Sequence, residues 1–230
     1  MGEFGIGQAV KRKEDDTLII GQGRYIDDIN EPGQAHGFVL RSPHANAKIL
    51  SIEAADALAM DGVLAIYSGK DVEEIGPLPC AVDAMFQFKR RDGSKRFFPT
   101  HHVLTRTHVR HVGDPVAFVV AETRTQAKDA AEAVFVEYEI LPSVTDTATA
   151  LAPGAPVIYG DETDGNDAFL FTMGDAKAAE AAFAAAHKTV RFKHVNQRIV
   201  AASMEPRGCI GVYDADVNRY TLHTNTQSVY

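Results

Sequence analysis

Residues 112–142 read VGDPVAFVVAETRTQAKDAAEAVFVEYEILP, and this stretch decides the fold of the chain. Gly113-Asp114-Pro115 predicts a tight turn, and the apolar run after it, residues 116–120, predicts a buried strand. Residues 125–133 have helical composition with alanines at helical spacing, and residues 134–140 alternate as a strand does. A strand, a helix and a second strand in succession predict an α+β fold with mixed layers of sheet and helix.

Three further strands are expected on the N-terminal side of this unit, because short runs of apolar residues alternate there with turn residues. They are residues 36–40, 49–53 and 63–67. No Gly-x-Gly-x-x-Gly sequence lies between any strand and helix, so a dinucleotide-binding fold is not indicated.

A linker between domains is predicted at residues 146–166, which are rich in Thr, Ala, Pro, Gly and acidic residues. After it, Asp175 is placed to cap a helix over residues 176–186. Three more strands are expected after this helix, at residues 189–197, 209–213 and 220–224. A domain that has only begun to form strands leaves sheet edges and apolar faces uncovered, so the second unit is expected to be incomplete.

The composition excludes several classes of protein. The 230 residues carry a net charge of −8, with 45% apolar and 23% charged residues. This composition is typical of a folded domain, and the acidic balance argues against a nucleic-acid partner, because phosphates need cationic neutralisation. The local basic cluster Lys89-Arg90-Arg91 is expected to be a solvated loop, with binding of an anion as the alternative.

Targeting signals are not indicated. The N-terminal residues 1–5 lack the basic and apolar regions of a secretory signal, and no apolar run approaches the roughly 18 residues needed to span a bilayer. The two cysteines, Cys80 and Cys209, suit a reducing compartment. A cytoplasmic protein without a membrane span is therefore expected.

The spacing of potential metal ligands gives little support for a metal site in this chain. Cys80 and Cys209 form no Cys-x-x-Cys pair, which argues against an iron–sulfur cluster or a thiolate zinc site. His108 and His111 would lie on opposite faces of the strand that their neighbours favour. The acidic stretch 161–167 fails the spacing of an EF-hand calcium loop, and a solvated turn is expected there.

Five blocks of sequence stand out in order along the chain. They are IGQAVKRKED (6–15) with GQGRYIDD (21–28), RSPHA (41–45), VGDPVA (112–117), VEYEILP (136–142), and NQR (196–198) with MEPRG (204–208). Together they resemble the large, molybdenum-cofactor-binding subunit of the xanthine dehydrogenase, aldehyde oxidase and carbon monoxide dehydrogenase family. Five blocks in the family's order cover nearly the whole chain, which makes the resemblance specific.

The resemblance implies a domain organisation. It implies an N-terminal extension at residues 1–16, an α/β hammerhead domain at 17–145, the linker at 146–166, and the truncated start of a molybdopterin-binding domain at 167–230. The fold class implied is therefore α+β, a hammerhead domain followed by an incomplete cofactor-binding domain.

The resemblance also implies an activity, cofactors and partners. Enzymes of this family hydroxylate an aldehyde, a heteroaromatic ring or CO with oxygen from water, and the molybdenum–molybdopterin cofactor carries the chemistry. Electrons leave through 2Fe–2S clusters and usually FAD. Because this chain has no cluster cysteines, an FAD-binding medium subunit and a 2Fe–2S small subunit are the expected partners, alongside a small-molecule substrate.

One functional residue is carried over from the family. The family has a Thr-Gln pair on the strand after the Met-Glu-Pro-Arg-like motif, and its glutamine contacts a ligand of the molybdenum. The pair here is Thr226-Gln227, so Gln227 is expected to bind the cofactor through its amide. No catalytic residue and no metal ligand is assigned. Glu205 and Arg207 are expected to form a structural ion pair.

The family continues with a Gly-Gly-Phe-Gly segment and a catalytic glutamate near its C-terminus, and neither occurs before Tyr230. The chain by itself is therefore expected to bind no cofactor and to have no turnover. Two hypotheses of function stay open. One is that the chain is part of a molybdenum hydroxylase; the other is that it is a non-catalytic hammerhead module, which either docks partner subunits or is a decayed remnant. The Met-Glu-Pro-Arg sequence favours the carbon monoxide and aldehyde branch over xanthine.

Overall fold

The computed structural model describes residues 11–79, 88–197 and 199–226. These residues divide into two compact units. The larger unit contains residues 35–189, and the smaller unit combines the described residues before 35 with those after 189.

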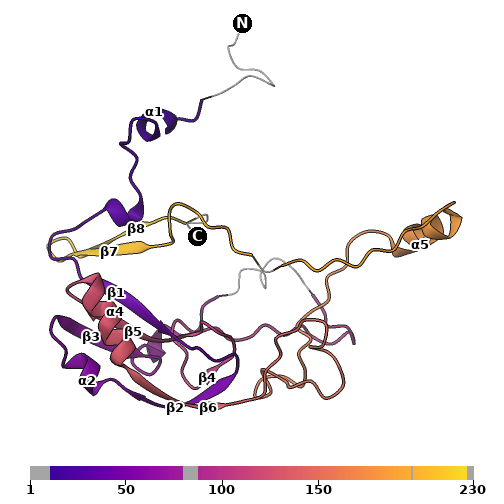
Figure 1. Ribbon diagram of the computed structural model, residues 1–230, viewed down its shortest axis with the longest axis horizontal. Helices are drawn as coiled ribbons and strands as arrows, with labels where there is room; N and C mark the ends of the chain where they lie inside the picture. Colours follow the sequence, from indigo (N-terminus) through magenta and orange to yellow (C-terminus); the bar gives the residue numbers. More distant parts are fainter. Residues whose placement is uncertain (1–10, 80–87, 198, 227–230) are drawn as a thin grey trace, which may run out of the picture. The chain divides into compact units, whose positions relative to one another are not determined.

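The described part of the larger unit contains six strands and three α-helices (Figure 1). The strands are β1 (His36–Arg41), β2 (Ala47–Glu53), β3 (Val63–Ser68), β4 (His108–Val109), β5 (Pro115–Ala121) and β6 (Phe135–Ile140). The helices are α2 (Ala55–Leu58), α4 (Arg124–Ala133) and α5 (Ala176–Ala185), with a 3-10 turn η2 at Glu73–Ile75.

The smaller unit is built from short elements. It contains α1 (Asp15–Leu18), a 3-10 turn η1 (Ile26–Asp28), and the strands β7 (Cys209–Asp214) and β8 (Arg219–Thr224). Among the residues that the structure describes in either unit, no helix has the length and apolar character to cross a membrane.

The strands of the larger unit form two antiparallel sheets, in the orders β1-β5-β3 and β4-β2-β6. The central strands are therefore β5 and β2. The predicted strand–helix–strand unit is confirmed as β5, α4 and β6, but its two strands belong to different sheets. Helix α4 thus connects the two sheets along the chain and packs on the sheet that contains β5.

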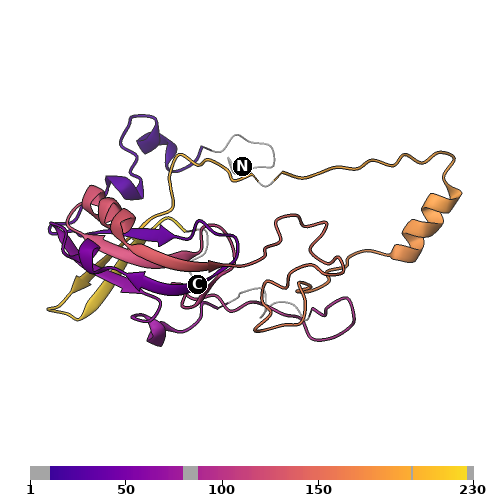
Figure 2. The same cartoon turned by 60° about the horizontal axis from the view of Figure 1, so that its bottom comes forward.

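One face of β5 is buried beneath α4 (Figure 2). Val119 has no exposed surface, and it packs with the α4 residues Ala130 and Ala131. Alanines at helical spacing let the helix approach the sheet closely, and burial of their methyl groups contributes to the hydrophobic stabilisation. The alanine pattern of the sequence therefore marks the face of α4 that packs on the sheet.

The other face of β5 packs against the second sheet. Val116 lies in a cluster with Ala47 of β2 and Val109 of β4, and none of the three has exposed surface. Ile52 and Val136 contact both this cluster and the one beneath α4. Since β5 is buried on both faces, it reads as a continuous apolar run and not as an alternating strand.

Gly37 on β1 makes room for an aromatic side chain of β5. A Cβ atom at position 37 would lie 2.3 Å from Cζ of Phe118 and 2.6 Å from its Cε2. These distances are far below van der Waals contact, so any larger residue at position 37 would displace the Phe118 ring. A glycine in a strand interior often marks such a close approach.

The turn that precedes β5 is fixed by the end of β1. Gly113 has φ +95°, a conformation that glycine adopts at no steric cost. Its backbone N donates to the carbonyl of Ser42 at 2.8 Å, and Ser42 N donates to the carbonyl of Asp114 at 2.9 Å. The Arg41 guanidinium donates to the carbonyl of Gly113 at 2.8 Å. Two of the five sequence blocks, 41–45 and 112–117, therefore meet in space.

A third block joins them at the end of β6. The Asn46 side chain donates to the carbonyl of Pro142 at 2.7 Å, and Leu141 N donates to the carbonyl of Asn46 at 2.9 Å. The rings of His44 and Tyr138 meet edge to face, with centroids 4.8 Å apart. These blocks therefore hold strand ends together and serve the fold.

The hairpin of the smaller unit has the turn that its Asp and Asn residues favour. The predicted strands over residues 209–213 and 220–224 are confirmed as β7 and β8, which pair in register from Cys209↔Thr224 to Asp214↔Arg219. Asp214 Oδ1 accepts from the backbone N of Asp216 at 3.1 Å, and Asn218 has φ +49°. Asp and Asn favour such turns because their side chains bond the nearby backbone and tolerate left-handed φ.

The strand predicted at residues 189–197 is wrong, because the backbone there forms no strand. Val190 is 84% exposed and Phe192 is 81% exposed. A strand needs a neighbour to pair its N–H and C=O groups, and the described residues supply none at this segment. Local alternation of the sequence cannot reveal whether that neighbour exists.

The start of α4 depends on one hydroxyl group, and this can be tested. Thr123 Oγ1 accepts from the backbone N of Gln126 at 3.2 Å. We predict that Thr123→Ala lowers the free energy of unfolding by about 1 kcal/mol, because an orphan N–H of the first turn loses its partner. Urea unfolding followed by circular dichroism measures this. The control is Thr123→Ser, which keeps the hydroxyl; an equal loss in that variant would contradict the capping role.

Candidate functional site

Gln227, the predicted cofactor-binding residue, lies outside the described residues. The chain is described up to Thr226, so the surroundings of the site can be built from the residues that lead into it. These are the β7–β8 hairpin and the segment 204–208, which both belong to the smaller unit.

The side chain of Asn225 ties the end of β8 to the segment 204–208. Its Nδ2 donates to the carbonyl of Pro206 at 2.7 Å, and its Oδ1 accepts from the backbone N of Gly208 at 3.0 Å. Thr224 Oγ1 donates to the carbonyl of Gly208 at 3.1 Å. Two segments separated by the whole hairpin are therefore fixed to each other directly before Thr226.

The predicted ion pair between Glu205 and Arg207 is wrong. Among the ion pairs of the described residues, none joins these two side chains. Instead, Glu205 Oε1 accepts from the backbone N of Ile26 at 3.1 Å. Ile26 begins η1, and the first N–H groups of a helical turn have no partner within it. The carboxylate therefore satisfies a backbone donor from the other end of the sequence.

The larger unit contains a separate pocket of about 550 Å³. Its lining comes mostly from residues 100–115 and from residues 159–162. The charged and titratable side chains in its wall are His101, His102, His108, His111, Arg106, Arg110, Asp114, Tyr159, Asp161 and Glu162. Sequence spacing did not bring these residues together, because the two segments are about 50 residues apart in the chain.

Arg110 is the centre of this pocket's polar network. Its side chain is only 9% exposed, and its Nη2 donates to both oxygens of Asp161, at 2.7 and 2.6 Å. Its Nη1 donates to the carbonyl of Ile158. The guanidinium lies over the ring of Tyr159, 4.3 Å from the centroid. Arg110 therefore attaches residues 158–161 to the strand region of the larger unit through three kinds of contact.

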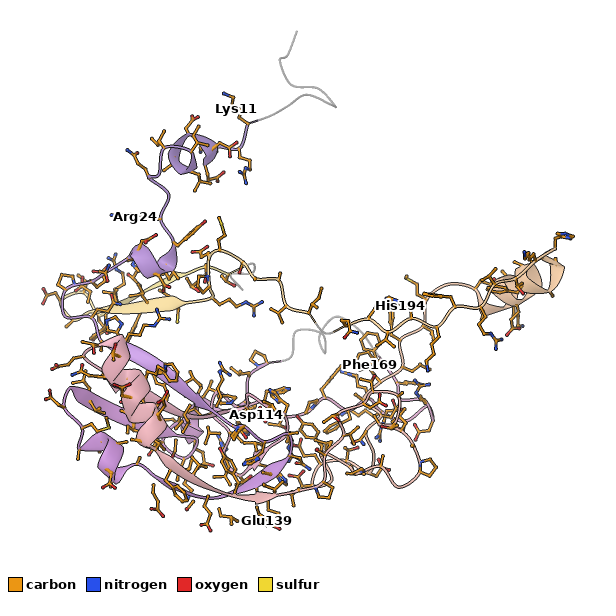
Figure 3. All side chains as sticks on the ribbon, in the orientation of Figure 1. Lys11, Arg24, Asp114, Glu139, Phe169 and His194 are labelled. Atoms are coloured by element: carbon orange, nitrogen blue, oxygen red, sulfur yellow. The ribbon has the colours of Figure 1, made fainter. Side chains whose placement is uncertain are left out.

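The other carboxylates of the pocket are also engaged. Asp114 Oδ2 accepts from the backbone N of Arg110 at 2.5 Å, and Asp114 Oδ1 lies 3.0 Å from Nδ1 of His111. Glu162 accepts from Thr100 Oγ1 at 3.1 Å. Figure 3 labels Asp114 within the dense group of side chains in this unit. The carboxylates of the pocket are therefore bound by protein groups of the two segments that line it, which indicates a structural junction.

The electrostatics of the pocket fit that conclusion. Burial, assisted by the nearby Arg110, lowers the pKa of His108, so its neutral form is favoured. Burial acts to raise the pKa of Asp161, but the hydrogen bonds from Arg110 and from its own backbone, together with the nearby positive charge of Arg110, hold this pKa below its usual value. Burial raises the pKa of Tyr159. Within the described ranges, no group of three or more His, Cys, Asp or Glu side chains is arranged to hold a metal ion.

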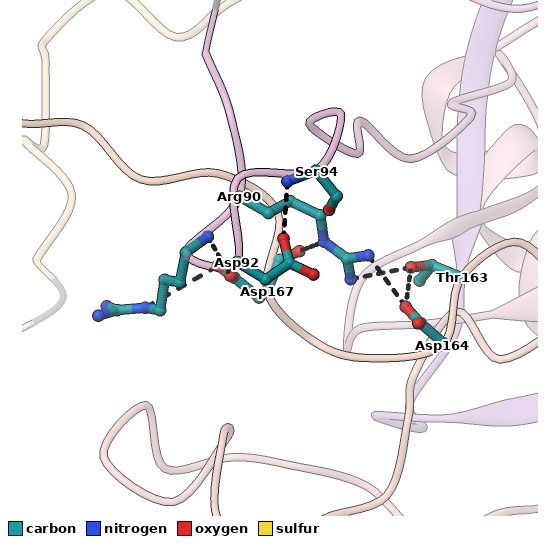
Figure 4. A network of polar contacts seen from close by, with 7 residues as sticks. Arg90, Asp92, Ser94, Thr163, Asp164 and Asp167 are labelled. Carbon is teal, nitrogen blue, oxygen red and sulfur yellow. Dashed lines mark hydrogen bonds and ion pairs between the residues drawn. The ribbon is translucent and has the colours of Figure 1, made fainter.

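A second arginine makes a similar attachment (Figure 4). Arg90 Nε donates to the carbonyl of Asp167 at 2.7 Å, its Nη1 donates to Asp164 Oδ1 at 2.9 Å, and its Nη2 donates to Thr163 Oγ1 at 3.1 Å. The backbone N of Arg91 donates to Asp167 Oδ2 at 2.9 Å. The acidic stretch 161–167 is thus the partner of the basic cluster.

The sequence predicted two independent solvated segments here, and for Arg90 that prediction is wrong. The Arg90 side chain is 14% exposed, whereas that of Asp164 is 88% exposed. The spacing of residues in the sequence does not indicate which charged residues 74 positions apart will contact each other. The basic and acidic runs were visible in the sequence, but their proximity depends on the course of the chain between them.

The larger unit has two antiparallel sheets joined by α4, and the hairpin β7–β8 follows it in the sequence. Residues 20–142 match the family model described as aldehyde oxidase and xanthine dehydrogenase, a/b hammerhead domain. Residues 159–230 match the molybdopterin cofactor-binding domain. The chain belongs to the aldehyde oxidase and xanthine dehydrogenase family.

Known proteins resemble nearly the whole chain. The large subunit of nicotine 6-hydroxylase from Paenarthrobacter nicotinovorans is 36% identical over 225 residues, which are 96% of this chain and 26% of that protein. The carbon monoxide dehydrogenase large chain of Hydrogenophaga pseudoflava is 33% identical, over 94% of this chain and 27% of that protein. The crystal structure of quinoline 2-oxidoreductase from Pseudomonas putida 86 superimposes with a TM-score of 0.77 at 36% identity, over 96% of this chain and 27% of that one.

The chain spans about a quarter of the length of the relatives that it matches. The resemblance expected from the five sequence blocks, and the fold class that it implied, are confirmed by these matches. The predicted boundaries of the extension, hammerhead domain, linker and cofactor-binding domain stay predictions.

The contact between Arg110 and Asp161 can be measured by a double-mutant cycle. We predict a coupling free energy of about 1–3 kcal/mol for Arg110→Ala with Asp161→Ala, because both carboxylate oxygens accept from one nitrogen of a buried guanidinium. The matched control is the surface pair Lys48–Glu139, whose side chains are each 49% exposed and 2.9 Å apart. This pair is expected to couple by less than about 1 kcal/mol. Equal coupling in the two pairs would contradict the junction described here.

The lowered pKa of His108 predicts a pH dependence of stability. The unfolded chain titrates near the ordinary value of 6.5, and the folded chain titrates below it. The folded state therefore has the full contribution above pH 6.5 and loses it as the pH falls towards the folded pKa. NMR titration of the imidazole measures the shift, and His108→Gln is expected to reduce the loss of stability on acidification. The exposed His101, replaced in the same way, serves as the control; an ordinary pKa at His108 would refute the prediction.

Proposed function

We propose that this chain is part of the large subunit of a molybdenum hydroxylase, an oxidoreductase that hydroxylates its substrate with oxygen derived from water. The observation that carries the proposal is the succession of a hammerhead domain and a molybdopterin-binding segment in one chain. The relatives support it, because their names describe large subunits of enzymes that act on nicotine and carbon monoxide.

Gln227 is proposed to bind the cofactor. The molybdenum–molybdopterin group, when bound, supplies the redox chemistry of hydroxylation. A glutamine amide carries both a donor and an acceptor, which suits an oxo or hydroxyl ligand of the metal. Thr224 and Asn225, which precede Gln227, are hydrogen-bonded to the backbone of residues 206–208, and we assign them a role in supporting the segment.

The described residues cover only part of such a site. A cofactor site of this kind encloses its ligand, which takes more protein surface than one hairpin and the segment beside it. We propose that the remaining walls come from the part of a full-length subunit that the relatives have and this chain does not span.

The substrate is proposed to be a nitrogen heteroaromatic compound. The two comparisons with 36% identity are to proteins named for nicotine and quinoline, whereas the carbon monoxide dehydrogenase large chains are 33% and 30% identical. Hydroxylation of an aldehyde or oxidation of CO is the alternative within the family. Assays with a heteroaromatic compound, an aldehyde and CO separate these substrate classes.

The proposed partners are an FAD-binding medium subunit and a 2Fe–2S small subunit, which accept the electrons. A relative named as the gamma subunit of a 6-hydroxypseudooxynicotine dehydrogenase complex supports a multi-subunit assembly. We place the protein in the cytoplasm, which suits the exposed free thiol of Cys209.

If Gln227 binds the cofactor, removal of its side-chain amide will lower the activity of the enzyme. In the protein purified with the chains that accompany it in its own cells, Gln227→Ala is expected to lower the turnover per molybdenum atom by about 10- to 100-fold, since partners of metal ligands have effects of this size. The measurement is substrate-dependent reduction of an artificial electron acceptor, normalised to metal content. The control is Gln22→Ala, an exposed glutamine of the same unit. Wild-type turnover in the Gln227 variant would contradict the assigned role.

A further inference from the structure

Three segments that are distant in the sequence meet within the smaller unit. They are the start of η1 at Ile26, residues 205–208, and the end of β8 at Thr224 and Asn225. Four hydrogen bonds join them, and each involves a side chain of one segment and the backbone of another. The sequence blocks 21–28 and 204–208 are therefore parts of one tertiary arrangement.

The contact between η1 and residues 205–208 has a polar and an apolar component. Glu205 Oε1 accepts from Ile26 N at 3.1 Å, and the Ile26 residue is only 7% exposed. A Cβ atom at position 208 would lie 2.9 Å from Cγ2 of Ile26, so the glycine lets the isoleucine pack against the backbone. Because the hydrogen bond is partly buried, leaving its N–H unpaired would be costly.

The contact between residues 205–208 and β8 depends on an amide. Asn225 donates to Pro206 O and accepts from Gly208 N, so both ends of its side chain are used. An amide can do this, whereas a carboxylate lacks the donor and an alkyl group lacks both functions. The backbone that leads into Thr226 is consequently held at two points on one neighbouring segment.

We infer that Glu205 and Asn225 are positioning residues for the cofactor-binding segment. Glu205 anchors residues 205–208 on η1, and Asn225 anchors the end of β8 on the same residues, so the N-terminal segment supports the backbone that leads into the proposed cofactor ligand. This inference rests on the proposed function of Gln227. Neither side chain is assigned contact with the cofactor, and both act through the backbone.

Four variants test the inference in the protein purified with its accompanying chains. Glu205→Ala and Asn225→Ala remove the anchors. Glu205→Gln keeps a carbonyl oxygen that can accept from Ile26 N, and Asp216→Ala removes an exposed carboxylate from the β7–β8 turn of the same unit. Two properties are measured: hydrogen–deuterium exchange of peptides that contain Ile26 and Gly208, and turnover per molybdenum atom.

Both anchor variants are expected to exchange faster by on the order of tenfold, at Ile26 for Glu205→Ala and at Gly208 for Asn225→Ala. Their turnover per molybdenum atom is expected to fall by on the order of tenfold, because supports of a metal-site ligand have such effects. Glu205→Gln and Asp216→Ala are expected to behave like the unmodified protein.

Unchanged hydrogen–deuterium exchange in the two anchor variants would overturn the inference. Faster exchange with unaltered turnover per molybdenum atom would also overturn it, because it would indicate a role in folding alone. Failure of Glu205→Gln to restore both properties would overturn the role assigned to the carboxylate oxygen. Absence of molybdenum from the unmodified protein would overturn the proposed function, and the inference with it. The exchange measurement does not depend on the metal, so the two failures are distinguishable.

Discussion

The larger unit depends on the burial of β5 on both faces. Val119 packs beneath the alanines of α4, and Val116 packs against the second sheet, so one strand of seven residues ties the helix and both sheets together. Burial on two faces favours small and β-branched residues, which make up most of the run from Pro115 to Ala121, and Gly37 makes room for its one large side chain, Phe118. The surrounding blocks then fix where the strand begins, because the turn at Gly113 is hydrogen-bonded to Ser42.

Local sequence patterns predicted a helix, strand or turn correctly where the residues that stabilise it are close in the sequence, or where the element is fully buried. The run before Ala121, the alanines of α4 and the turn at Asp214 each carry a signal that neighbouring residues complete. The patterns failed where a distant partner decides the outcome. The strand expected at 189–197 lacks a neighbour among the described residues, and Arg90 is buried by an acidic stretch some 74 residues away. The periodicity of apolar residues is a property of one segment, whereas the pairing of strands or charges depends on two segments.

The candidate site shows the same division. Gln227 entered through family resemblance, since a glutamine at a strand end carries no signal of its own. The sequence indicated only one of the two residues that support this segment. It marked Glu205 as part of a motif but predicted the wrong partner for it, and no sequence pattern marked Asn225. The structure gives the physical reason for both, because Glu205 binds the backbone of Ile26, 179 positions earlier, and Asn225 bridges to Pro206 and Gly208. Motif residues near a cofactor segment can therefore serve as anchors of the backbone and not as ligands.

The central claim is that this chain contributes to a molybdenum-cofactor site, and elemental analysis of the protein purified from its own cells tests it most directly. Inductively coupled plasma mass spectrometry on the purified complex measures molybdenum per subunit. The account predicts stoichiometric molybdenum in a complex that also contains FAD and iron–sulfur subunits. A homogeneous, folded protein without molybdenum would contradict the account, and would leave a hammerhead module that serves partner docking alone.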